Sequence, residues 1–242
     1  RKKPYFCNEF CQVFIKMSEN QQDQDNFVQD AIGKSEAFIQ QNRKSLSIIV
    51  GALVIAVGGY LFYQKVYVAG KEKEAETVLF RAEDYFKKDS TKLAINGDGN
   101  NPGFEEIASD YSVSKSGNMS NYYLGMSYLK SKQFDKAIEA LKSYNAQDAM
   151  SGSIAFGAIG DAYVELNNMD EAISYYEKAC KENPNNFTTP IMLMKLGGAQ
   201  EAKGNYKEAI NAYERIRKDY PSSTEGSQID KYIARASTLA GE

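Results

Sequence analysis

The sequence predicts an all-α protein, a right-handed solenoid of helix pairs that follows one N-terminal transmembrane helix. Two observations carry this prediction. A run of 19 residues without a charged side chain occupies positions 45–63. Farther along the chain, three glycines recur at spacings of 35 and 37 residues, and each is followed by an alanine 12 residues later. Repetition at a period of 20–50 residues is typical of solenoids, in which each unit packs only on its neighbours.

Composition limits the chemistry that the chain can perform. Its 242 residues include no His, which excludes Ser-His-Asp and Cys-His triads and His-ligated zinc. The formal net charge is -3, whereas a nucleic-acid binder is normally basic. The sequence also shows no nucleophile–base pair, phosphate loop or metal cluster. We therefore expect a non-enzymatic protein without cofactor, metal, nucleic-acid partner or small-molecule substrate.

The N-terminal residues differ from the rest of the chain. Residues 1–16 are basic, match nothing downstream and precede Met17, so we expect them to be an upstream extension outside the natural protein. Cys7 and Cys11 lie about one helical turn apart, but a structural zinc site needs four ligands and no further Cys or His is near. Residues 17–44 are polar and are expected to form a cytoplasmic N-terminal segment.

Residues 45–65 are predicted to form the transmembrane helix. At 1.5 Å per residue, a run of this length spans roughly 28 Å, close to the hydrocarbon core of a bilayer. Arg43 and Lys44 precede the run and Lys65 follows it. Three tyrosines crowd its C-terminal end, where an aromatic belt would lie: Tyr60, Tyr63 and Tyr67. A buried core helix and a cleaved signal peptide are the alternatives, but both usually have shorter apolar runs, so we expect an uncleaved anchor.

Charge alone does not orient this helix. Three cations lie on each side of it at similar distances, which is a tie under the positive-inside rule. They are Lys34, Arg43 and Lys44 before the helix, and Lys65, Lys71 and Lys73 after it.

Three helix-pair repeats are predicted at 118–152, 153–189 and 190–223. Small residues would let the two helices of each pair approach: Gly125, Gly160 and Gly197 in the first helix, and Ala137, Ala172 and Ala209 in the second. Tyrosines would fill the remaining space: Tyr128, Tyr163, Tyr176 and Tyr213. Pro184 and Pro221 would end the second helix of the later two repeats.

Less regular segments flank these repeats. Residues 75–117 are predicted to be a degenerate first repeat, in which Phe104–Tyr111 resembles the second helix of the later repeats and an insertion precedes it. The insertion includes an Asn-Gly-Asp-Gly-Asn run, but the positions that an EF-hand requires for Gly and Glu hold Asn101 and Ile107, so a turn is expected rather than a calcium site. Residues 224–242 are predicted to be a capping helix, with Ile229 and Ala236 on one face.

The repeats resemble the tetratricopeptide repeat, which has a period near 34 and the pattern W-x2-L-G-x2-Y, A-x3-F, P. Leu124-Gly125 with Tyr128, and Ile159-Gly160 with Tyr163, match the first part of this pattern. The departures are mild: the Trp position holds Asn121, Phe156 and Leu193, the last repeat has Gln200 for Tyr, and the first repeat lacks its Pro.

The whole arrangement, over residues 17–242, resembles the YfgM-like single-pass ancillary subunits of the bacterial Sec translocon, of the Bacteroidetes type. The resemblance implies an inner-membrane protein with a cytoplasmic N-terminus and periplasmic repeats. It also implies translocon components and periplasmic chaperones as partners. An envelope-assembly or cell-division coordinator with similar repeats is the alternative function.

The family pattern places the concave, partner-binding surface on the first helix of each repeat, at four positions counted from the Gly. The residues predicted to line this groove are Met119, Tyr122, Met126, Leu129, Ile154, Asp161, Val164, Met194 and Glu201. The set is largely apolar and nearly free of cations, which favours apolar or extended polypeptide segments as ligands. The alternative is that several of these side chains simply pack against the neighbouring repeat.

Two further features have weak functional interpretations. Cys180 lies near the end of a helix without a partner cysteine, and we expect it to be partly buried and unreactive. Asp89-Ser90-Thr91 resembles a short O-glycosylation motif of Bacteroidetes envelope proteins, which makes Ser90 or Thr91 a candidate for modification.

Overall fold

A computed structural model describes residues 8–148 and 150–241, so the expected extension at 1–16 lies partly outside the described residues. Every regular element in the described ranges is a helix. This confirms the predicted all-α class and its tetratricopeptide-type solenoid. The chain divides into two compact units, Arg1–Gln64 and Lys65–Glu242, which are described separately.

The first unit consists mainly of α1 (Asn8–Phe62), one continuous helix. It contains the predicted apolar run except for Tyr63, and the polar segment before that run is helical as well, so no structural boundary separates residues 44 and 45. Among the described residues one helical stretch is apolar and long enough to cross a membrane, with a mean hydropathy of 2.2. None of its apolar window is buried inside the molecule, which is not the environment of a core helix.

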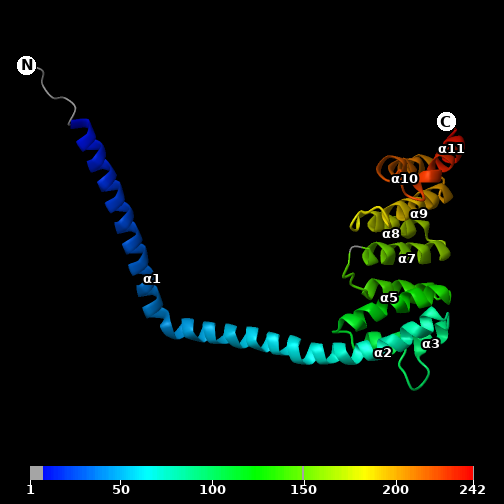
Figure 1. Cartoon of the computed structure of the whole chain (residues 1–242), viewed down its shortest axis with the longest axis horizontal. Helices are drawn as coiled ribbons and strands as arrows, with labels where there is room; N and C mark the ends of the chain where they lie inside the picture. The colour runs from blue at the N-terminus through cyan, green and yellow to red at the C-terminus, as the bar shows by residue number, and fades with distance from the viewer. Residues whose placement is uncertain (1–7, 149, 242) are drawn as a thin grey trace, which may run out of the picture. The chain divides into compact units, whose positions relative to one another are not determined.

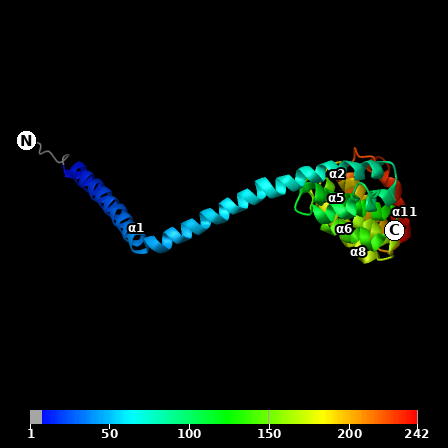
Figure 2. The same ribbon diagram turned by 90° about the horizontal axis from the view of Figure 1, so that it is seen from below.

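The second unit is a stack of helix pairs (Figures 1 and 2). A π-helical segment, η1 (Tyr63–Val68), precedes α2. The helices are α2 (Ala69–Lys87), α3 (Thr91–Asn96), α4 (Phe104–Asp110), α5 (Lys115–Lys130), α6 (Phe134–Ser143), α7 (Ser151–Glu165), α8 (Met169–Lys181), α9 (Thr189–Ala202), α10 (Tyr206–Asp219), the 3-10 turn η2 (Gly226–Gln228) and α11 (Ile229–Ala240). The pairs α5–α6, α7–α8 and α9–α10 largely overlap the three predicted repeats, although α5, α7 and α9 begin three, two and one residues before the predicted starts. The capping helix α11 packs on α10.

One turn geometry joins the two helices of every pair. Its central residue has a positive φ, and the next backbone N–H donates to a carbonyl five residues earlier, as in a Schellman motif. The four such turns centre on Asp89 (φ 55°), Lys132 (φ 59°), Asn167 (φ 57°) and Gly204 (φ 82°). Their hydrogen bonds run from Ser90 to Tyr85, Gln133 to Tyr128, Asn168 to Tyr163 and Asn205 to Gln200, at 2.8–2.9 Å.

The turn at Asp89 corrects the predicted layout of the first repeat. Ala82 precedes Asp89 by seven residues, as Gly125 precedes Lys132, and Ala94 follows Ala82 by 12 residues. Both alanines are fully buried. The second helix of this repeat therefore begins as α3 and not at Phe104. The helix breaks at Gly97, where φ is +80°, and helical structure resumes as α4, so the insertion interrupts the second helix instead of preceding it.

The glycines of the repeats do allow close helix contact, but with a different residue than expected. A Cβ on Gly160 would lie 2.5 Å from Cε1 of Tyr176, and a Cβ on Gly197 would collide with the ring of Tyr213. The expected partners, Ala172 and Ala209, are fully buried, yet the side chain four residues later in the sequence occupies the space that each glycine leaves. In each second helix the expected alanine and the observed tyrosine are four residues apart, about one helical turn. The prediction therefore chose the correct helix face but a position one turn too early.

Candidate partner-binding groove

The nine residues predicted to line the groove lie on α5, α7 and α9, and all are half-buried. Six of them also pack against the cores between repeats. Met119, Tyr122, Met126 and Leu129 pack on the core shared by α6, α7 and α8. Val164 and Met194 pack on the core that extends to α11. These side chains therefore contribute to packing between repeats while a part of each faces solvent.

Asp161, at the centre of the predicted groove, is held by two neighbours. The Tyr176 hydroxyl donates to its Oδ1 at 2.7 Å, and the Lys195 ammonium lies 2.8 Å from Oδ1 and 2.5 Å from Oδ2. Burial and the adjacent Asp161 carboxylate raise the pKa of Tyr176, so its hydroxyl stays protonated and continues to donate. Lys195 comes from the next repeat, and the pair therefore joins α7 to α9.

Glu201 has a similar arrangement one repeat farther on. Its carboxylate accepts from the Arg235 guanidinium of α11 at 2.8 Å and is only 12% exposed. Burial and Glu201 together raise the pKa of Tyr213, which lies beneath the pair. The capping helix thus supplies a cation to the end of the groove.

These two pairs correct the expectation that the groove is nearly free of cations. Lys195 and Arg235 were missed because the family pattern assigns neither position to the concave surface. A sequence signal was nevertheless present. Asp161 and Lys195 are 34 residues apart, and so are Glu201 and Arg235, which is one repeat length. Opposite charges at this spacing fall on adjacent layers of a solenoid.

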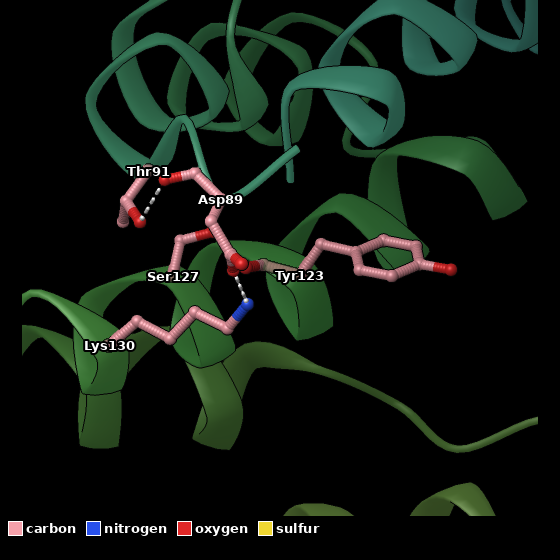
Figure 3. Close-up of polar contacts among 5 residues, drawn as sticks. All are labelled: Asp89, Thr91, Tyr123, Ser127 and Lys130. Atoms are coloured by element: carbon pink, nitrogen blue, oxygen red, sulfur yellow. Dashed lines mark hydrogen bonds and ion pairs between the residues drawn. The ribbon is translucent and has the colours of Figure 1, made fainter. Parts of the chain in front are cut away.

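A third pair of this kind joins the first repeat to α5 (Figure 3). Lys130 donates to Oδ1 of Asp89 at 2.7 Å, and this hydrogen bond lowers the pKa of Asp89. The Thr91 hydroxyl donates to the Asp89 carbonyl oxygen at 3.4 Å. The candidate glycosylation motif therefore lies in a turn whose Asp side chain is paired with Lys130.

A hollow of about 350 Å³ lies where α5 and α7 meet. It includes two of the predicted groove residues, Leu129 and Asp161. Its lining combines apolar and charged side chains: Leu129, Lys130, Lys132, Phe134, Asp161 and Glu165. Such a lining suits part of a polypeptide, with an apolar side chain and polar neighbours, better than a purely apolar ligand.

Two other candidate sites have structural explanations. Cys180 is 2% exposed, and burial raises the pKa of its thiol to about 11, so the thiol is protonated at neutral pH. The carboxylate of Asp98 accepts from the Tyr85 hydroxyl at 2.6 Å and from the Asn101 N–H at 2.7 Å, which closes the Gly/Asn turn on itself. Within the described residues, no three Cys, Asp or Glu side chains are grouped to hold a metal ion, and the side chains of Cys7 and Cys11 lie outside them.

Comparison with protein families identifies the repeats. Models of the tetratricopeptide repeat match residues 120–148, 155–186 and 192–223. These segments coincide with the three regular helix pairs. The chain thus contains three tetratricopeptide repeats, and such repeats form protein–protein interaction scaffolds that are typically non-catalytic.

The curated relatives each match less than half of this chain. The chain is 29% identical over 118 residues to tetratricopeptide repeat protein 29 of Macaca fascicularis, a match that covers 46% of this chain and 25% of the relative. It is 32% identical over 101 residues to the uncharacterized protein ycf37 of Guillardia theta, which covers 40% of this chain and 55% of that one. The chain thus matches between a quarter and about half of the length of these relatives.

Solved structures show the same fold. The MamA protein superposes with a TM-score of 0.55 at 20% identity, over 69% of this chain and 82% of that one. A putative kinesin light chain with tetratricopeptide-like repeats, from Podosopora anserina, gives a TM-score of 0.53 at 14% identity, over 70% and 88%. At these identities the likeness concerns the fold alone.

Proposed function

We propose that this protein is a membrane-anchored scaffold of the bacterial cell envelope that binds partner polypeptides in the groove formed by α5, α7 and α9. The observation that supports the proposal best is the row of half-buried Met, Tyr and aliphatic side chains along these three helices. Such side chains adapt to varied apolar segments. The mixed hollow at the α5–α7 junction offers additional polar contacts.

The anchor would be the apolar part of α1, whose side chains are exposed and are not buried by other parts of the described chain. Ile48 is 71% exposed and Ile55 is 76% exposed. Burial of these side chains in a bilayer would remove that apolar surface from water. The proposed topology is a single pass through the inner membrane, with the N-terminus in the cytoplasm and the repeats in the periplasm. There the groove would assist Sec-dependent translocation or periplasmic chaperones.

Crosslinking in intact membranes, followed by mass spectrometry of the captured proteins, tests this function. Replacing Tyr122 and Met126 by Ser removes apolar surface from the groove, so capture of the main partner is expected to fall severalfold while circular dichroism stays unchanged. Lys181 is 77% exposed and pairs with Glu177 on its own helix, so Lys181→Ala is the control. Equal capture by the wild type and the groove variant would contradict the proposal.

A further inference from the structure

The N-terminal ends of α7 and α9 expose large apolar side chains beside the groove. Phe187 is 75% exposed, Met150 is 48% exposed and Ile191 is 40% exposed. Large exposed apolar side chains that gather at the ends of two adjacent helices are candidates for an interaction site. We call the four residues Met150, Ile154, Phe187 and Ile191 the apolar edge.

The apolar edge repeats from one layer of the solenoid to the next. Met150 and Phe187 each precede the glycine of their repeat by ten residues, and Ile154 and Ile191 each precede it by six. A Cβ on Gly157 would lie 2.8 Å from Cε of Met192, so α7 and α9 lie directly against each other near these ends. Two successive layers therefore carry a pair of apolar side chains at the same two repeat positions, Met150 with Ile154 and Phe187 with Ile191. A partner with apolar residues at regular spacing would meet both layers.

Two carboxylates border this surface. Oδ1 of Asp148 accepts from the backbone N–H groups of Met150 and Ser151, both at 2.8 Å. These hydrogen bonds and one from the Ser151 hydroxyl lower the pKa of Asp148, which keeps it ionised at neutral pH. A Cβ on Gly152 would lie 3.3 Å from Oε1 of Glu182, so the Glu182 carboxylate also lies against the first turn of α7.

Neither carboxylate is neutralised by a side chain of the protein. Within the described residues no ion pair joins Asp148 or Glu182 to a Lys or Arg. Lys181, which directly precedes Glu182 in the sequence, pairs with Glu177 at 3.6 Å. The apolar edge is thus bordered by negative charge that remains available to a ligand.

We propose that the apolar edge binds polypeptide segments in which apolar residues alternate with Lys or Arg. The proposal rests on the proposed polypeptide-binding function and specifies the chemistry of the partner. Apolar side chains of the segment would cover Met150 and Phe187, and its cations would pair with Asp148 and Glu182. An acidic segment of equal hydrophobicity would be repelled by the same two carboxylates.

Two synthetic amphipathic peptides of about 18 residues test the proposal. Both have Leu on one helical face, and the other face carries Lys in one peptide and Glu in the second. Their affinities for the full chain in non-ionic detergent are measured by fluorescence anisotropy. We expect the Lys peptide to bind about tenfold or more tightly than the Glu peptide in low salt. The difference should shrink towards about 0.5 M NaCl, because exposed charges are screened.

Three variants locate the binding site. Phe187→Ala should weaken binding of the Lys peptide by about tenfold, the effect of losing one buried aromatic contact. Phe80→Ala is the matched control, since Phe80 is a 65% exposed aromatic residue on α2, away from the apolar edge. Asp148→Asn with Glu182→Gln should reduce binding of the Lys peptide and strengthen that of the Glu peptide, because the repulsion by the two carboxylates is removed. Asn retains the oxygen that accepts the N–H groups of α7.

The outcomes separate this inference from the function on which it rests. If both peptides bind equally and Phe187→Ala weakens both, the surface binds polypeptides but the preference for basic segments is wrong. If Phe187→Ala and Phe80→Ala have the same effect, the apolar edge is not the site. If neither peptide binds the wild-type chain, the polypeptide-binding function itself is contradicted.

Discussion

At the scale of single residues, the contact between Gly160 and Tyr176 leaves little space for a substitution. A side chain at position 160 has no space, because the Tyr176 ring already occupies it. Gly198 lies on the next first helix of the solenoid, but nothing lies within 4 Å of the position its Cβ would take. A larger side chain is therefore tolerated at position 198 but not at position 160, because only Gly160 packs against an aromatic ring.

We expect Gly160→Ala to destabilise the protein by about 1–3 kcal/mol, because overpacking displaces Tyr176 or separates α7 from α8. The melting temperature of the full chain in non-ionic detergent is the measurement. Gly198→Ala should be neutral or stabilise by up to about 1 kcal/mol, because alanine restricts the unfolded chain without a clash. Equal melting temperatures for the two variants would refute the proposed close contact.

The sequence assigned the predicted groove residues to the first helices of the repeats but missed their electrostatic partners. Asp161 and Glu201 were recognised, whereas Lys195 and Arg235 were not. The reason is that a repeat pattern describes positions within one unit, while these ion pairs form between units. Tyr176 was expected to lie between the two helices, but its direct contact with Gly160 was not specified, since sequence spacing does not show which turn of the second helix lies opposite the glycine.

At the scale of helices, the ion pairs connect successive layers. Asp89–Lys130 connects the first repeat to α5, Asp161–Lys195 connects α7 to α9, and Glu201–Arg235 connects α9 to α11. In all three pairs the acid comes before the base in the chain. These contacts are partly exposed, so we expect each to contribute modestly to stability and to be weakened by salt.

A double-mutant cycle on Asp161→Asn and Lys195→Met measures one of these contacts. We expect a coupling energy of about 0.2–1 kcal/mol in low salt, as for other partly exposed pairs. The coupling should decrease at high salt. Urea unfolding of the four proteins gives the coupling energy. Zero coupling under both conditions would show that the pair does not link α7 to α9.

The layout of the first repeat was harder to predict than that of the later repeats. A glycine in the turn between the helices would have indicated the boundary, but Asp89 adopts the left-handed conformation there. The sequence of Phe104–Tyr111 also resembles the second helices of the later repeats more closely than the sequence of α3 does. Local sequence similarity thus competed with the spacing of 12 residues between Ala82 and Ala94, and the spacing proved to be the better guide.

At the scale of the whole molecule, the topology is open to a direct test. Alkaline phosphatase fused after residue 242 is expected to be active, because the enzyme folds only outside the cytoplasm and the proposal places the repeats there. A reporter that is active only in the cytoplasm, fused at the same position, should be inactive. The reverse result would overturn the proposed orientation but would leave the fold and the groove unaffected.

The buried thiol of Cys180 offers a way to observe motion without altering the protein. It lies in the core between α8, α9 and α10, and it is the only cysteine after position 11. A thiol reagent can reach it only when this core opens, so the rate of modification at this residue, resolved by peptide mass spectrometry, gives the free energy of local opening. A ligand that tightens the last two repeats would slow that rate, which makes the native chain its own reporter of binding.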